Sequence, residues 1–292
     1  MTLRDYQIDI SDRAAVCLKE NKIAYLCCET RTGKTIIAFE TIRKHGAKNV
    51  LFVTKKKAIK SIETDYQHFK NHFACTVINY ESVSKCKGGY DLVVCDEAHS
   101  LGAFTKPAKR VKDLMKFTKN LPIIYLSATP TPESFSQIYH QFYISSFSPF
   151  KEYKSFYRWA KDFVTVKKLF LYNREVNDYS NADQDKIEQW TNHLFFAQTQ
   201  QASGFSEVIK EEILTVPMSP LQKEIHDTLL RNRVVYGKSG AVILGDTAVK
   251  LLNKIHQICS GTIKDEDGKG HIISKIKGEY IKEYFVGKKI VV

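Results

Sequence analysis

Five short apolar segments alternate with helix-like segments over the first 130 residues of the chain. They are rich in β-branched and aromatic residues and span 24–28, 49–54, 75–79, 91–95 and 122–126. This alternation predicts an α/β fold in which a parallel sheet is flanked by helices. Polar motifs follow most of the segments. Because ligands of open α/β sheets bind at the carboxyl ends of the strands, we expect these motifs to meet at one edge of the sheet.

The first of these motifs is "ETRTGKT", which runs from Glu29 to Thr35. Gly33 and Lys34 follow an apolar segment and open a helix-like one, which places backbone N–H groups and a helix N-terminus where phosphate oxygens can bind. The strict pattern of such phosphate loops has glycine at the position of Cys28. The Cβ of this cysteine requires a backbone with negative φ. "TGKT" alone is a weak signal, and it gains weight from motifs elsewhere in the chain.

Two adjacent acids, Asp96 and Glu97, end the apolar segment "DLVVC". Phosphoryl transfer needs a carboxylate near the metal and a group that activates water. Asp96 would hold Mg²⁺ together with the Thr35 hydroxyl, and Glu97 would activate the attacking water. The alternative is that these acids cap the next helix, but the lysine loop upstream favours phosphoryl transfer. A third motif, "SATP", places Ser127 and Thr129 just past another apolar segment, where alone it would indicate only a turn.

In this order and at this spacing, "ETRTGKT", "DEAH" and "SATP" resemble motifs I, II and III of superfamily 2 helicases and translocases. The motor core of those proteins is a pair of RecA-like domains. The resemblance implies a RecA-like P-loop fold, ATP and Mg²⁺ as cofactors, and catalytic roles for Lys34, Asp96 and Glu97. The residues it implies for coupling the nucleotide state to nucleic-acid binding are His99, Ser127 and Thr129.

The amino-terminal "LRDYQ" resembles the Q-type motif of the same superfamily. The resemblance implies that the Gln7 amide contacts adenine and that Arg4 lies at the same pocket. The alternative is that Gln7 is simply a polar residue of the first helix. The predicted nucleotide contacts are Arg4, Gln7, Thr30, Arg31, Thr32, Gly33, Lys34, Thr35 and Ile36.

The second half of the chain resembles the remodeller-type (Swi/Snf-like) branch after motif III. It contains an S-x-x-Q helix pattern near 219–230 and a helix pattern at 251–261 that carries a Q-x-C segment. The form of motif I, "TRTGKT", is more similar to compact phage or mobile-element helicases. Aromatic residues are dense over 135–172. They could stack on nucleic-acid bases, but their three- and four-residue spacing favours packing in a core.

These patterns predict four regions. Residues 1–130 form a first RecA-like domain, 131–200 a mainly helical insertion, 201–275 a strand and helices that link to a second domain, and 276–292 the start of a second RecA-like domain. The pattern after the loop at 264–271 predicts a helix, and the final "VGKKIVV" predicts a strand. We expect the chain to be a fragment or a shortened form, because motifs V and VI with their arginine fingers are not found in it.

The charge of the chain favours a polyanionic partner. Lys and Arg number 44 against 32 Asp and Glu, a net charge of +12, which supports phosphate contacts with little sequence preference and a strong salt dependence. The resemblance to motifs Ia and Ib, and to basic residues after DEAH, implies nucleic-acid contacts. The remodeller-like second half implies that duplex DNA is preferred over RNA. Any single lysine among them could instead be a solvated side chain. The predicted contacts are Thr54, Lys55, Asn79, Tyr80, Lys106, Lys109 and Arg110.

Seven cysteines occur without a C-x-x-C pair or a Cys/His grouping at zinc spacing, so we expect reduced thiols. The first residues, "MTLRDYQIDI", lack the apolar core of a signal peptide, and no apolar run is long enough to span a bilayer. These features predict a location in the cytoplasm, or in the host cytoplasm for a phage-encoded protein, without membrane insertion.

The favoured function is an ATP-dependent DNA helicase or translocase, of which this chain is the ATP-binding lobe. The second interpretation is the motor part of a restriction-type enzyme. The third is a non-catalytic nucleic-acid-binding module that lacks the second lobe. Because an arginine finger commonly contributes ~10³ to 10⁵ in turnover, we expect the chain alone to hydrolyse ATP very slowly.

Overall fold

The computed structural model describes the chain except residues 1, 104, 172–173, 206–210, 238–239 and 288–292. It contains two compact units, residues 1–207 and 208–292, and each is described by itself. The sequence placed boundaries near 130, 200 and 275, and those boundaries stay predictions. Five of the seven residues of the predicted strand "VGKKIVV" lie outside the described residues.

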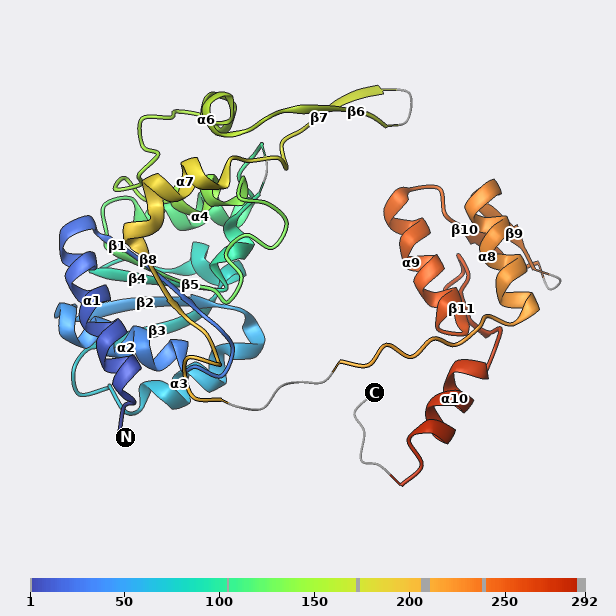
Figure 1. Cartoon of the computed structure of the whole chain (residues 1–292), viewed down its shortest axis with the longest axis horizontal. Helices are drawn as coiled ribbons and strands as arrows, with labels where there is room; N and C mark the ends of the chain where they lie inside the picture. The colour runs from blue at the N-terminus through green and yellow to red at the C-terminus, as the bar shows by residue number, and fades with distance from the viewer. Residues whose placement is uncertain (1, 104, 172–173, 206–210, 238–239, 288–292) are drawn as a thin grey trace. The chain divides into compact units, whose positions relative to one another are not determined.

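Unit 1 is built on a six-stranded sheet with the order β3-β2-β4-β5-β1-β8, in which every pairing is parallel (Figure 1). The predicted α/β class with a parallel sheet is therefore confirmed. All five predicted strands are present to within one residue at each end. The strands of the sheet are β1 (Ile23–Cys28), β2 (Asn49–Thr54), β3 (Ala74–Asn79), β4 (Leu92–Asp96), β5 (Ile123–Leu126) and β8 (Phe195–Gln198).

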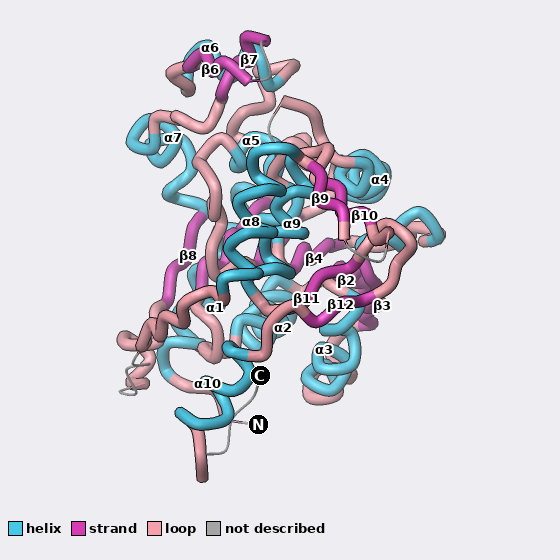
Figure 2. The backbone as a smooth tube through the Cα atoms, turned by 90° about the vertical axis from the view of Figure 1, so that its right-hand side faces the viewer, coloured by secondary structure: helices cyan, strands magenta, loops and turns pink. Residues whose placement is uncertain are grey.

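Helices cover both faces of this sheet. Helices α2 and α3 lie on one face and α4 and α7 on the other (Figures 1 and 2), and α1 packs against α2. The central strands between these helices are shielded from solvent, because nearly all residues of β1, β2, β4 and β5 are buried. The helical segments up to β5 are α1 (Asp5–Asn21), α2 (Lys34–His45), η1 (Lys56–Ala58), α3 (Ile59–Tyr66), η2 (Tyr80–Lys85), η3 (Ala98–Leu101) and α4 (Lys109–Thr118).

The sequence predicts a mainly helical segment at 131–200, and the structure contains strands there as well as helices. Besides its helices it has an antiparallel hairpin, and its last strand, β8, pairs with β1 in the main sheet. The ring of Phe195 stacks on Tyr25 with centroids 4.4 Å apart, which fixes β8 at this edge. The elements before β8 are α5 (Gln137–Phe142), α6 (Phe156–Phe163), β6 (Lys167–Leu171), β7 (Arg174–Asp178), α7 (Gln184–Thr191) and η4 (Asn192–Leu194).

The aromatic residues of this segment form a core, as their spacing predicted. Ring centroids of Tyr139 and Trp159 lie 5.4 Å apart, and those of Trp159 and Phe163 lie 5.2 Å apart. Six large aromatic side chains are at most 2% exposed, which removes them from any base-stacking surface. They are Tyr139, Phe142, Phe150, Phe156, Trp159 and Phe163.

Unit 2 is a small α/β unit with its own core. Ser219 caps α8 by accepting from the Gln222 N–H, and Gln222 accepts from the Ser219 N–H, while its amide donates to Ile258 O at 2.8 Å. The predicted S-x-x-Q helix, the helix ending in Q-x-C and the helix after the loop at 264–271 are all present. The elements are α8 (Pro220–Asn232), β9 (Val234–Tyr236), β10 (Val242–Leu244), α9 (Ala248–Cys259), β11 (Thr262–Lys264), β12 (Gly270–Ile272) and α10 (Ile276–Tyr284).

All seven cysteines are free thiols. Within the described part of the chain, none of the helices is both long enough and apolar enough to cross a bilayer.

Candidate functional site

Three neighbouring strands bring the three motifs together. In the sheet β4 lies beside β5 and β5 beside β1, and the register sets Asp96 and Leu26 level with Leu126. The residues that follow these positions are therefore at one edge of the sheet. They belong to the lysine loop after β1, the acidic pair at the end of β4 and the Ser127 turn after β5.

The first helix fixes the lysine loop. The Tyr6 hydroxyl and the Gln7 amide both donate to the carbonyl oxygen of Thr32, at 2.9 and 3.2 Å. The Arg4 N–H donates to Gln7 Oε1 at 3.0 Å, so both ends of the Gln7 amide are bonded. Gln7 thus positions the loop in this structure, and its contact with adenine stays a prediction. The Arg4 guanidinium lies over the Phe205 ring, 5.0 Å from its centroid.

Two features of its surroundings favour glycine at position 33. Its φ is +81°, and a Cβ built on it would lie 2.5 Å from Gln7 Nε2. Arg31 also has positive φ, at 66°, whereas Cys28 is not among the described residues with positive φ. The predicted tolerance of Cys28 is confirmed, because it is the last residue of β1 and keeps a strand backbone.

The segment just after β8 also holds the lysine loop, which the sequence did not predict. The Gln200 N–H donates to Glu29 Oε2 at 2.7 Å, and the Gln200 amide donates to the carbonyl oxygen and the hydroxyl of Thr30 at 3.1 Å. The partners are 170 or more positions apart in the sequence. Nothing in the local pattern around "AQTQQ" indicates this pairing. Thr30 and Arg31 are exposed, Thr32 is buried, and Thr35 and Ile36 are half-buried at the start of α2.

Lys34 turns back onto its own loop, where its ammonium donates to the Cys28 carbonyl at 2.8 Å. It also acts on the acid at the end of β4. Burial raises the pKa of Asp96, and this shift is opposed by the hydrogen bond from Thr54 and, more weakly, by the positive charge of Lys34. The lysine loop and the acidic pair follow β1 and β4, and so both lie at the same edge of the sheet.

Two residues at the ends of β2 and β3 position Asp96. The Thr54 hydroxyl donates to Asp96 Oδ2 at 2.6 Å, and the Tyr80 hydroxyl donates to the Asp96 carbonyl at 2.6 Å. Thr54 is fully buried and Tyr80 is 4% exposed. Both were expected to contact nucleic acid. Because β2 is a direct neighbour of β4 and η2 follows β3, these hydroxyls point instead at the acid.

Glu97 is held in an uncommon backbone conformation. Its φ of 50° and ψ of 46° lie in the left-handed region, which costs a non-glycine residue about 1 kcal/mol and is typical of functional sites. Its carboxylate lies 3.7 Å from Lys55 Nζ and 3.4 Å from His99 Nδ1. His99 Nδ1 lies 3.0 Å from Ser127 Oγ, which also accepts from the Thr129 N–H at 3.2 Å. The three predicted coupling residues are thus connected to the second acid.

Helix α5 braces the segments after motifs II and III, a role that the sequence did not predict. The Gln141 amide accepts from the Tyr25 hydroxyl at 2.7 Å and donates to the Pro130 carbonyl at 2.8 Å. His140 Nδ1 bonds the Ala103 carbonyl. Both side chains are at most 2% exposed. The segments that follow DEAH and SATP are therefore joined through the buried polar face of one short helix.

The oxygens at this site suit Mg²⁺ bound with a nucleotide. The Thr35 hydroxyl and the Asp96 carboxylate are hard oxygen ligands, which Mg²⁺ prefers. In the described part of the chain, His, Cys, Asp and Glu side chains form no cluster of three or more that could hold a metal ion alone. A magnesium ion at Thr35 and Asp96 would therefore need oxygens from phosphate and water, as in P-loop sites.

The remaining basic residues predicted to contact nucleic acid are exposed. Lys55 follows β2, and Lys106 precedes α4. The Asn79 amide donates to Glu81 Oε2 at 2.7 Å. The pKa of Glu81 is lowered by a backbone hydrogen bond, then by Asn79, with a smaller effect of Arg110. Arg110 lies at the start of α4, which packs against η2, the segment after β3. The exposed basic residues are Lys55, Lys106, Lys109 and Arg110.

Residues 19–263 match the SNF2-related domain family, and no curated protein sequence matches the chain. One similar solved structure is the ATP-dependent Type ISP restriction-modification enzyme LlaBIII bound to DNA, with 20% identity, a TM-score of 0.32, and coverage of 44% of this chain and 13% of that one.

Two further structures are similar. A nuclease-deletion mutant of the Type ISP enzyme LlaGI, in complex with a DNA substrate mimic, has 17% identity and a TM-score of 0.33, covering 45% of this chain and 18% of that one. The Hef helicase domain of Pyrococcus furiosus has 14% identity and a TM-score of 0.40, covering 78% and 45%. This chain spans less than half the length of each. Because the family match covers most of its residues, the chain belongs to the SNF2-related domain family of superfamily 2 helicases.

Proposed function

We propose that this chain is the ATP-binding lobe of a motor that couples ATP hydrolysis to movement along DNA. The observation that supports it most directly is the convergence of Lys34, the Asp96–Glu97 pair and Ser127 at the carboxyl ends of three adjacent strands. Membership of the SNF2-related family supports a helicase-type motor domain. The proposed setting is a reducing cytoplasm, which the seven free thiols suit.

The lysine loop would bind the phosphates. Gly33 supplies the left-handed backbone of the loop, and the N-terminus of α2 presents N–H groups to an anion. The Lys34 ammonium, now on the Cys28 carbonyl, is proposed to move to the β- and γ-phosphates. Thr35 and Asp96 would hold Mg²⁺, which neutralises charge on the phosphate oxygens when bound. A bound cation would favour the ionised form of Asp96, which burial otherwise disfavours.

Glu97 is the proposed general base. Its backbone is left-handed, and its carboxylate lies beside His99 and Lys55. A carboxylate there can accept a proton from the attacking water. The contact of His99 with Ser127 gives the base a connection to the segment after β5, which helix α5 braces in turn. A change in either segment would alter the position of the base.

DNA would contact the exposed basic residues around the strand ends. Their phosphate contacts would position the duplex without reading sequence, and affinity should fall steeply with salt. We assign Thr54 and Tyr80 to the support of Asp96 and keep Asn79 as a proposed contact. The proposed partners of the chain are duplex DNA and a second RecA-like domain.

The test is single-turnover hydrolysis of radiolabelled ATP, with no nucleic acid and then with duplex DNA, single strands or RNA. Turnover should be slow, because the arginine finger of a second lobe commonly contributes ~10³ to 10⁵. Glu97→Gln should bind Mg·ATP as the wild type does and lose hydrolysis, while Glu63→Gln on exposed α3 should change neither. Equal hydrolysis by Glu97→Gln would remove the base assignment. Binding without hydrolysis in every variant would indicate a non-catalytic module.

A further inference from the structure

A pocket of about 220 Å³ lies beside the motif III segment, apart from the phosphate loop. Strands β1 and β8, helices α5 and α7, and the turn at Pro130 contribute to its walls. An apolar cavity of ~150 Å³ is large enough to bind benzene. This pocket can therefore hold a single six-membered ring with a short substituent.

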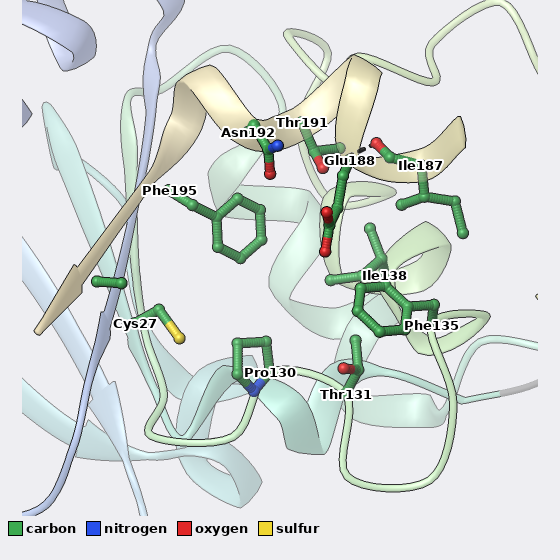
Figure 3. A pocket seen from close by; sticks show the side chains of 11 residues that line it. Cys27, Pro130, Thr131, Phe135, Ile138, Ile187, Glu188, Thr191, Asn192 and Phe195 are labelled. Atoms are coloured by element: carbon green, nitrogen blue, oxygen red, sulfur yellow. Dashed lines mark hydrogen bonds between the residues drawn. The ribbon is translucent and has the colours of Figure 1, made fainter. Parts of the chain in front are cut away.

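The walls combine apolar surface with one carboxylate. Phe195 and Ile138 face the pocket, and the carboxylate of Glu188 points into it (Figure 3). Among the described residues that line the pocket, Glu188 is the one that carries a charge. The Gln184 amide donates to Glu188 Oε1 at 2.8 Å and so helps to orient the group.

The nearby lysine of α7 does not neutralise Glu188. Lys186 Nζ donates to the Asp162 carbonyl at 2.6 Å and lies over the Phe163 ring, 5.1 Å from its centroid. Within the described chain, no Lys, Arg or His nitrogen lies within 4.0 Å of the Glu188 carboxylate. An anion beside an apolar wall favours a ligand with a cationic end and an apolar body.

We propose that this pocket binds a small organic cation, a primary ammonium carried on a compact aromatic or aliphatic body. The ammonium pairs with Glu188, and the body packs on Phe195 and Ile138. Where the ammonium approaches the face of the Phe195 ring, a cation–π interaction adds to the binding. The occupant would contact Cys27 and Pro130. Cys27 precedes Cys28, whose carbonyl accepts from Lys34, and the Pro130 carbonyl accepts from Gln141. Of the lining residues that the structure describes, none belongs to the phosphate loop at 29–35.

The probe is benzylamine, compared with phenylacetate and benzyl alcohol, which keep the ring and change the charge. Binding to the full chain is measured by ligand-observed NMR at low salt. We expect a Kd for benzylamine on the order of 1 mM, about tenfold tighter than for benzyl alcohol, and no binding of phenylacetate. These measurements contain no ATP, so their outcome is independent of the proposed motor function.

Cys27 supplies a reporter inside the pocket. Its sulfur lies in the wall (Figure 3), and burial raises the pKa of the thiol, so alkylation should be slow. Saturating benzylamine should slow the alkylation of Cys27 by N-ethylmaleimide at least threefold, as followed by peptide mass spectrometry. The half-buried Cys259 of unit 2 is the internal control and should react at an unchanged rate.

Two charge variants on the same helix decide the assignment. Glu188→Gln should weaken benzylamine about tenfold and leave benzyl alcohol unchanged. Asp185→Asn removes an equal charge from an exposed position outside the pocket and should change neither affinity. Equal affinity of the three probes, loss of benzylamine binding in both variants alike, or unprotected Cys27 at saturation would each overturn the proposal.

Discussion

Replacing Gly33 with alanine should destabilise unit 1 and weaken ATP binding together. A non-glycine residue with φ near +81° costs about 1–2 kcal/mol. The new Cβ would also lie 2.5 Å from Gln7 Nε2 and force the amide off the Thr32 carbonyl, which costs about 1 kcal/mol more. The expected loss in the free energy of unfolding is about 2–3 kcal/mol.

Gly46 provides the matched control. Its φ is +93° at the end of α2, and a Cβ there would meet no atom within 4 Å. Gly46→Ala should therefore show the backbone cost alone, about 1–2 kcal/mol, and leave Mg·ATP binding unchanged. In the double variant Gly33→Ala with Gln7→Ala, the new Cβ no longer meets the Gln7 amide. The loss in the free energy of unfolding should therefore be about 1 kcal/mol smaller than the sum of the two single losses.

The assay is urea unfolding followed by tryptophan fluorescence. Both tryptophans, Trp159 and Trp190, lie in unit 1, so the signal reports the unit that holds the site. Binding is measured with a fluorescent ATP analogue. If Gly33→Ala unfolded with the same free energy as Gly46→Ala and bound the nucleotide like the wild type, this reasoning would be refuted. The close approach of Gly33 to Gln7 would then contribute nothing to stability or to binding.

Three further predictions use the same unfolding assay. Asp96→Asn should stabilise unit 1 at pH 7, because burial raises the pKa of this carboxyl and makes its ionised form costly. That gain in stability should shrink as the pH falls through the raised pKa and vanish below 3.8, the ordinary pKa of an aspartate. A gain that persists at pH 3 would contradict this prediction. Burial lowers the pKa of His140, so the wild type should lose stability as the pH falls through 6.5 toward that lowered pKa, and His140→Gln should lose less. Gln141→Leu should cost about 2–3 kcal/mol, because it leaves the Tyr25 hydroxyl and the Pro130 carbonyl without their partner; a loss under ~0.5 kcal/mol would refute the bracing role of α5.

The sequence predicts the parts of this fold that depend on local pattern. The apolar runs of β1, β2 and β4 are buried on both faces, so they can be recognised in the sequence without knowing their neighbours in the sheet. The motifs were assigned to one edge from their positions after these strands. Cys28 was compatible with the loop because a strand-end position needs no positive φ.

The parts that the sequence did not predict depend on which strands are neighbours. Thr54 and Tyr80 follow strands as a nucleic-acid contact would, but the order β3-β2-β4 directs their hydroxyls to Asp96. Strand β8 is only four residues long, and its place in the sheet is set by pairing with β1, far away in the sequence. Gln141 is polar on a buried helix, and its partners come from Tyr25 and Pro130. Such long-range hydrogen bonds leave no periodic signal.

The central claim is that Lys34 and Asp96 bind one Mg·nucleotide. Equilibrium titration of the chain with a fluorescent ATP analogue, with and without Mg²⁺, tests it most directly. Lys34→Ala should weaken binding at least ~100-fold, since the phosphate charges lose their cation partner, and Asp96→Ala should abolish the effect of Mg²⁺. Lys60→Ala, on exposed α3, should bind like the wild type. Wild-type affinity in Lys34→Ala, or an undiminished Mg²⁺ effect in Asp96→Ala, would contradict the account.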